Sequence, residues 1–147
     1  MHPIHPMVVH FPIALLMSSV VFDLLEMRWR RSSFGDASLY TLIGGVIGAM
    51  LAVATGAVAE ELVEETGVPE GALEIHEALG YVVLWIFVGL CAIRFAMRRQ
   101  WIRERPALSI IFGLIGVMVL AAAGYSGGTL VYEFGAGVAP TITTVDP

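Results

Sequence analysis

The chain has 147 residues, of which 57% are hydrophobic and only 14% are charged. This composition excludes a disordered chain, which has low hydrophobicity, and an ordinary soluble domain, in which roughly 25% of residues are charged. The formal net charge of −5 argues against a nucleic-acid partner, because such proteins present basic surfaces.

Four apolar stretches are long enough to cross a bilayer, which takes about 20 residues of helix. We expect transmembrane helices at about residues 7–28, 37–59, 76–98 and 107–127. The hydrophobic runs are continuous rather than alternating, which favours helices over barrel strands. Similar lengths and short connections predict one all-α membrane domain over residues 1–147, folded as an up-down-up-down four-helix bundle.

Every basic residue is an Arg, and none precedes the first apolar run. The Arg residues follow the first span or lie at the end of the third span and just after it: Arg28, Arg30, Arg31, Arg94, Arg98, Arg99, Arg103 and Arg105. By the positive-inside rule, both of these loops are cytoplasmic. We therefore expect a bacterial inner-membrane protein with its N- and C-termini outside.

The first and third spans carry histidines near their predicted outer ends. His10 lies ~12 Å and His76 ~15 Å above the middle of their spans, at ~1.5 Å per residue. Two imidazoles on facing helices can supply both axial ligands of a haem, and neutral imidazole also binds zinc or copper. His5 is a substitute ligand, a third ligand or a partner that orients His10. The alternative is that these are solvated polar residues at the membrane interface.

Asp23 falls in the inner half of the first span, ~8 Å below its middle. An acid at this depth is costly unless it is paired or functional. Arg94 follows His76 by 18 residues, five helical turns, so both share one face of the third helix. We expect an Asp23–Arg94 charge pair, with a proton path as the weaker alternative.

Small residues recur every four positions in the second span and form a ridge: Gly44, Gly48, Ala52 and Gly56. Such ridges let helix backbones approach closely in membranes. We expect the ridge to pack against another helix. The alternative is that it makes room for a flat cofactor.

The fourth helix is expected to end at Gly127 and Gly128, because glycine commonly terminates helices. A glycine-rich outer tail then covers residues 128–147 and includes Tyr132. We expect this tail to fold back as a lid over the histidines. The alternative is a surface tail without a role at the site.

Two motifs resemble those of a known family. Near the N-terminus, residues 5–15 follow the pattern HPxxVHFPIAL, and near the C-terminus, residues 127–138 follow the pattern GGxLVYxxGxGV. Both patterns are similar to those of an uncharacterised family of bacterial four-helix predicted membrane proteins. Related domains occur in chains that also carry Rieske iron–sulfur or cytochrome c domains. The resemblance therefore implies electron transfer near quinones and points to His5, His10 and His76.

The single cysteine, Cys91, cannot build a redox centre of its own, so any such partner is another chain. We predict a protein or subunit that binds haem b near the outer face and exchanges electrons with quinone. The alternatives are an accessory subunit of a larger energy-transducing complex and a zinc or copper site. Expected partners are the lipid bilayer and other membrane or redox subunits, or a second copy. The sequence shows no nucleophile–base pair and no phosphate-binding loop, so an enzyme that acts on a soluble substrate is the least expected class.

Overall fold

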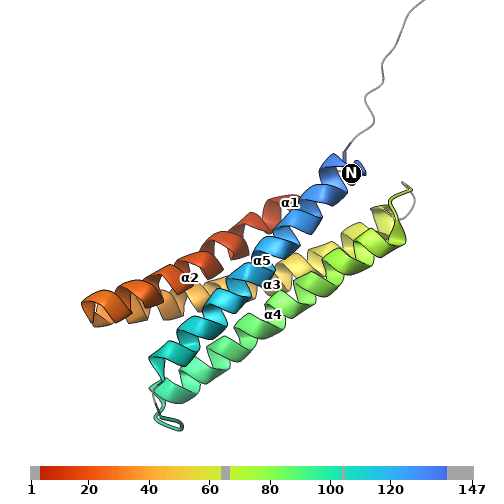
Figure 1. The fold of residues 1–147 in the computed structure, drawn as a ribbon. Helices are drawn as coiled ribbons and strands as arrows, with labels where there is room; N and C mark the ends of the chain where they lie inside the picture. Colours follow the sequence, from red (N-terminus) through yellow and green to blue (C-terminus); the bar gives the residue numbers. More distant parts are fainter. Residues whose placement is uncertain (1–3, 64–66, 104, 139–147) are drawn as a thin grey trace, which may run out of the picture.

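The computed structural model describes residues 4–63, 67–103 and 105–138, and it forms an elongated helical bundle (Figure 1). The helices are α1 (His5–Val8), α2 (His10–Trp29), α3 (Ser32–Val63), α4 (Glu70–Arg98) and α5 (Pro106–Tyr132). Four helical segments are long and apolar enough to cross a membrane, with α1 and α2 together forming the first. The predicted all-α four-helix architecture is confirmed.

Successive helices run antiparallel, and each packs against its neighbours in the chain (Figure 1). Helix α5, which forms the fourth long segment, also packs against α2, and this contact closes the bundle. The turn from α2 to α3 is tight because Arg30 adopts a left-handed conformation with φ of 51°. Pro69 is the N-cap residue of α4, and Pro106 is the first residue of α5, where the absence of a proline N–H costs no helical hydrogen bond.

The core is built from large side chains of some helices set against small residues of others. Phe87 and Leu16 are fully buried. A Cβ atom at Gly116 would lie 2.8 Å from Cζ of Phe87, and one at Gly113 would lie 2.9 Å from Cγ2 of Val20. The two glycines therefore let α5 approach α4 and α2 closely, as expected for helices packed in a membrane.

The ridge of small residues on α3 faces the first span. A Cβ atom at Gly44 would lie 3.3 Å from Leu15, and one at Gly48 would lie 3.2 Å from Pro12. Farther along the helix, Gly56 makes the same close approach to His5, at 3.2 Å. The ridge is thus filled by side chains of α1 and α2, which leaves no room there for a flat cofactor.

The fourth helix does not end at Gly127 and Gly128, as the sequence suggested, but continues to Tyr132. Two glycines cost roughly 2 kcal/mol of helix propensity, and burial of Leu130 against Val68 offsets this cost. Residues 133–138 follow as turns, while residues 139–147 of the expected tail lie outside the described residues.

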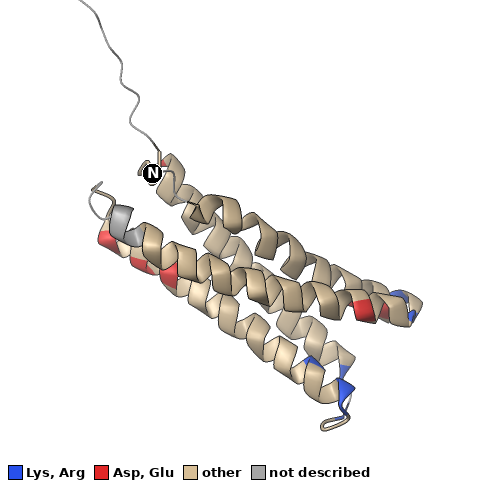
Figure 2. Cartoon of the chain, turned by 180° about the vertical axis from the view of Figure 1, so that it is seen from behind, with Lys and Arg blue, Asp and Glu red and all other residues tan. Residues whose placement is uncertain are grey.

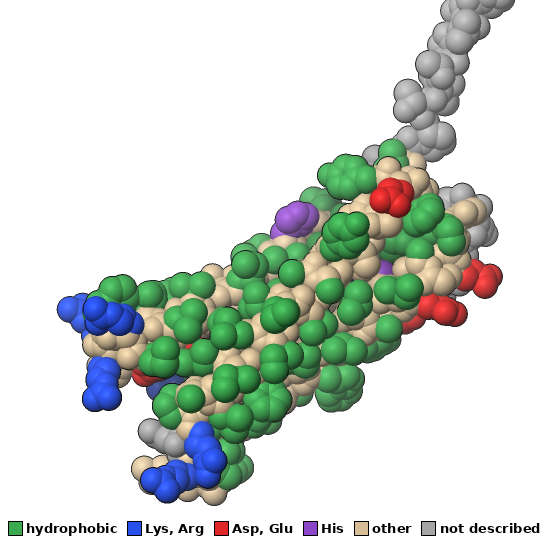
Figure 3. Space-filling view, viewed as in Figure 1, with side chains coloured by type: hydrophobic (Ala, Val, Ile, Leu, Met, Phe, Trp, Pro, Cys, Tyr) green, Lys and Arg blue, Asp and Glu red, His purple; other side chains and the backbone are tan. Residues whose placement is uncertain are grey.

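Charged residues gather at the two ends of the bundle, and apolar side chains cover the surface between them (Figures 2 and 3). We call the end with His5 and His76 the histidine end. The arginine end is the opposite one, which holds the α2–α3 and α4–α5 connections. An apolar surface between two polar ends matches a bilayer between two aqueous phases, and the chain is a membrane protein.

Candidate functional site

Two histidines from different helices meet at the histidine end. His5 on α1 and His76 on α4 have ring centroids 6.1 Å apart, with the ring planes at 82°. Both side chains are half-buried. The expected partner of His76 was His10, but His10 is exposed at the start of α2. His2 lies outside the described residues.

The helical repeat explains why His5 and not His10 faces the bundle. Leu16, which is fully buried, follows His5 by 11 residues, or about three turns, so the two share a face. His10 precedes Leu16 by six residues, which places it well round the helix, on the side away from the core. Only one of the two histidines can therefore point inward, and the core residues decide which one.

A backbone carbonyl fixes the protonation of the His5 ring. Nδ1 of His5 lies 2.9 Å from the carbonyl oxygen of Ala52 and 3.3 Å from Oγ1 of Thr55. Because a carbonyl only accepts hydrogen bonds, Nδ1 must carry the hydrogen and donate it. In the neutral ring, the lone pair of His5 is then on Nε2. Gly56 permits this contact because a side chain there would crowd the imidazole.

The His76 ring is held in the same way by α5. Its Nδ1 lies 2.9 Å from Oγ of Ser126, and Ser126 donates its own hydrogen to the carbonyl of Ala123. The serine oxygen therefore accepts from His76, which again places the hydrogen on Nδ1 and the lone pair on Nε2. A Cβ atom at Gly127 would lie 2.9 Å from Cε1 of His76, so a glycine is needed at this position.

This arrangement is the one that proteins use to prepare histidines as metal ligands. A ligating imidazole commonly donates its other N–H to a carbonyl or a similar acceptor, which fixes its tautomer and orientation. Within the described ranges, no group of three or more His, Cys, Asp or Glu residues gathers around a point. The expected set of His5, His10 and His76 is therefore not assembled, and the site offers two imidazoles.

The predicted lid residues have other positions. Gly127 belongs to α5 and contacts the His76 ring, whereas a Cβ atom at Gly128 would meet no other atom within 4 Å. Tyr132 is 90% exposed. These residues do not form a lid. The contribution of α5 to the site is instead the hydroxyl of Ser126, which sequence reasoning missed.

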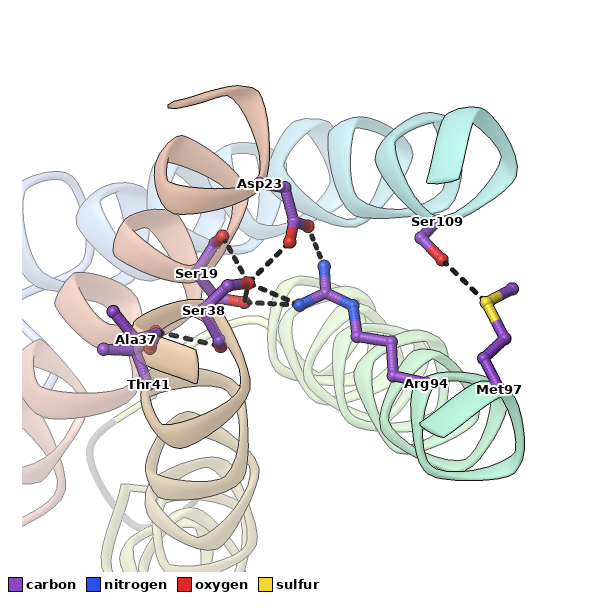
Figure 4. A network of polar contacts seen from close by, with 8 residues as sticks. All are labelled: Ser19, Asp23, Ala37, Ser38, Thr41, Arg94, Met97 and Ser109. Atoms are coloured by element: carbon purple, nitrogen blue, oxygen red, sulfur yellow. Dashed lines mark hydrogen bonds and ion pairs between the residues drawn. The ribbon is translucent and has the colours of Figure 1, made fainter. Parts of the chain in front are cut away.

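A second polar cluster lies near the arginine end (Figure 4). Asp23 on α2 and Arg94 on α4 form an ion pair with side chains 10% and 11% exposed. Ser38 on α3 places its Oγ 2.6 Å from Oδ1 of Asp23 and also contacts Arg94. Ser19, one turn before Asp23, lies 3.4 Å from the guanidinium. The cluster thus joins three helices, and no buried side-chain polar atom among the described residues lacks a partner.

The two serines of this cluster were missed from the sequence. Ser19 could have been found, because it precedes Asp23 by four residues and lies on the same face of the helix. Ser38 has no such signal, since only the packing of α3 against α2 brings it to the carboxylate. A polar residue on a different helix is not revealed by spacing along one chain segment.

Of the comparisons with known proteins, the one with protein families identifies the chain as a predicted membrane protein. No curated protein and no solved structure matches the chain. A family model described as predicted membrane protein matches residues 1–140, which is nearly the whole chain. The chain therefore belongs to the DUF2231 family of predicted membrane proteins.

Proposed function

We propose that the protein binds haem b between His5 and His76 and transfers electrons at the histidine end of the bundle. The observation that carries this proposal is the pair of adjacent imidazoles, each held through Nδ1 by a neighbouring helix. Each ring keeps its Nε2 lone pair for a ligand. An electron carrier of this kind exchanges electrons with quinone or with a redox subunit on another chain.

The number of ligands favours haem over a compact metal ion. A porphyrin would supply four nitrogens to its iron, so His5 and His76 would be enough to hold a haem. Zinc sites use three or four protein ligands, and only two histidines meet here.

The separation of the rings is also compatible with one shared metal. A histidine nitrogen binds a metal at about 2.0 Å, so rings on opposite sides of one ion have centroids about 6 Å apart. The observed separation is 6.1 Å. Gly80 follows His76 by one helical turn, and a Cβ atom there would meet nothing within 4 Å. This absence of a side chain offers space on α4 for the edge of a macrocycle.

The charge distribution supports an orientation for this carrier. The arginine end is cytoplasmic by the positive-inside rule, which puts His5 and His76 at the outer face of a bacterial inner membrane. The alternative of an accessory subunit that packs through its small-residue ridge is less well supported, because α1 and α2 already occupy that ridge.

The test is a visible spectrum of protein purified in mild detergent from haem-sufficient cells, air-oxidised and then reduced with dithionite. We expect a Soret band that shifts on reduction in the wild type and that is lost in His5→Ala and His76→Ala. The matched control is His10→Ala, which removes an exposed histidine from the same span and should leave the band unchanged.

A further variant tests the role of the serine hydroxyl. Ser126→Ala keeps both imidazoles but removes the acceptor that fixes the tautomer of His76. Loss of such a partner typically weakens metal binding by about 10- to 100-fold. Wild-type protein without a Soret band would overturn the proposal, and stoichiometric zinc or copper in the same sample would identify the metal-ion alternative.

A further inference from the structure

An open groove lies at the arginine end, where the α4–α5 connection meets the start of α5. Its volume is about 480 Å³. The residues that line it come from the connection and from the first two turns of α5: Arg103, Arg105, Pro106, Ala107, Leu108 and Ile111. We call this feature the arginine groove. It is at the opposite end of the bundle from the two histidines, so it is independent of the proposed haem site.

One part of the groove is suited to an anion. Residues 98–105 carry four Arg and one Glu, a net charge of +3, and one of these Arg residues, Arg98, is ion-paired with Asp36 on α3. Arg105 is the N-cap residue of α5 and makes no capping hydrogen bond with its side chain, and the helix dipole adds partial positive charge at this point. The guanidinium group presents its donors as a planar fork that matches the oxygens of a phosphate. The polar part of the groove therefore favours a phosphate group.

The other part of the groove is suited to a hydrocarbon chain. Leu108 and Ile111 are 40% and 53% exposed and lie three residues apart, on one face of α5. They lead from the two Arg residues along the apolar helix into the membrane span. Inorganic phosphate would gain nothing from this wall, whereas a molecule with a phosphate head and an acyl chain would contact both parts.

We propose that the arginine groove binds an anionic phospholipid, with its phosphate at Arg103 and Arg105 and one acyl chain against Leu108 and Ile111. Basic pockets beside membrane helices are known to recognise the head groups of anionic lipids. A zwitterionic lipid carries a compensating positive charge, which a site of net positive charge does not favour. The ligand is therefore distinguished by its charge as well as by its two-part chemistry.

The experiment compares the double variant Arg103→Gln/Arg105→Gln with the control Arg28→Gln/Arg31→Gln. Both remove two positive charges from the arginine end, but the control changes the α2–α3 side. Binding of phosphatidylglycerol, phosphatidylcholine and inorganic phosphate to full-length protein in detergent is measured by native mass spectrometry and by the shift in Tm. We expect wild type and control to bind phosphatidylglycerol, and the double variant to bind it roughly 10- to 30-fold more weakly.

A second variant keeps the charges and blocks the apolar wall. Ile111→Trp fills the groove at an exposed position that the core does not use, and it should also weaken phosphatidylglycerol binding. The proposal is overturned if the control loses as much affinity as the groove variant, since this would indicate general surface attraction. It is also overturned if phosphatidylcholine or inorganic phosphate binds as well as phosphatidylglycerol. The Soret band of these variants reports on the haem proposal separately.

Discussion

At the scale of single residues, the Asp23–Arg94 pair shows how a bilayer-spanning bundle accommodates charge. Both side chains are about nine-tenths buried, and hydroxyls of Ser19 and Ser38 surround them. A charge in this environment is costly unless its partners are all present. The cluster therefore ties α2, α3 and α4 into one arrangement, because each helix must bring its own polar group to the same place.

The energetic role of this pair can be measured by removing first the cation and then the acid. Arg94→Met leaves the Asp23 carboxylate without its cation, and we expect the free energy of unfolding to fall by about 3 kcal/mol. Adding Asp23→Asn to this variant removes the uncompensated charge and should restore part of the loss. Unfolding of purified protein by increasing mole fractions of SDS is the measurement. A double variant that is less stable than Arg94→Met would contradict this account.

At the scale of the helices, small residues have two different roles that the sequence does not distinguish. Gly116 faces the fully buried Phe87, whose ring cannot shift without disturbing the core. Gly89, on α4, has no atom beyond its own stretch of helix backbone within 4 Å of the place where a Cβ would be. Both lie in the middle of long apolar helices, so only the packing separates a required glycine from a replaceable one.

Alanine substitutions at these two positions should have opposite effects. Gly116→Ala overpacks the α4–α5 contact and should lower the free energy of unfolding by about 1–3 kcal/mol. Gly89→Ala adds helix propensity and meets no neighbour, so it should be neutral or stabilising by up to about 1 kcal/mol. The same SDS titration measures both. Equal effects at the two positions would mean that the close contact with Phe87 does not limit the approach of α5.

At the scale of the whole molecule, the bundle gathers its Arg residues at one end, where Asp23 and Asp36 pair with two of them. The Arg residues and the two connections that hold them lie at one end, and further acidic residues lie at the other (Figure 2). The two paired histidines belong to this second end. Two strongly exposed aromatic side chains lie toward opposite ends, Trp101 at 73% and Tyr125 at 79% exposure. Such residues prefer the two membrane interfaces, so their placement is consistent with a bundle that spans the bilayer once per long helix.

These charges predict an orientation of the bundle in the membrane, which can be checked by labelling. In a Cys91→Ala background, Glu133→Cys places a thiol at the histidine end and Ser33→Cys places one at the arginine end. We expect a membrane-impermeant maleimide to label Glu133→Cys in spheroplasts and Ser33→Cys only in inverted vesicles, because positive loops stay in the cytoplasm. The Cys91→Ala parent is the control, and the reverse pattern would show that the histidines face the cytoplasm.

The amino-acid sequence by itself determined the spans, the fold class and the family. These depend on hydrophobic runs and short motifs, which are properties of contiguous residues. The pairing of Asp23 with Arg94 was also foreseeable, because an acid within a span needs a partner and only one basic residue reached the same depth. The predicted end of the fourth span was less accurate, because burial of Leu130 stabilises α5 beyond Gly127 and Gly128.

Only the tertiary structure decided which histidine meets His76. The sequence contained a useful sign, since His5 precedes Asp23 by 18 residues, the same five turns that separate His76 from Arg94. This equality makes His5, and not His10, the histidine on the face of Asp23. Yet the face that points inward is set by the burial of Leu16 and by the contact of His5 with Ala52. The Ser126 hydroxyl that holds His76 comes from another helix, α5. Periodicity gives positions around one helix, whereas the rotation of four helices against one another depends on packing between distant segments.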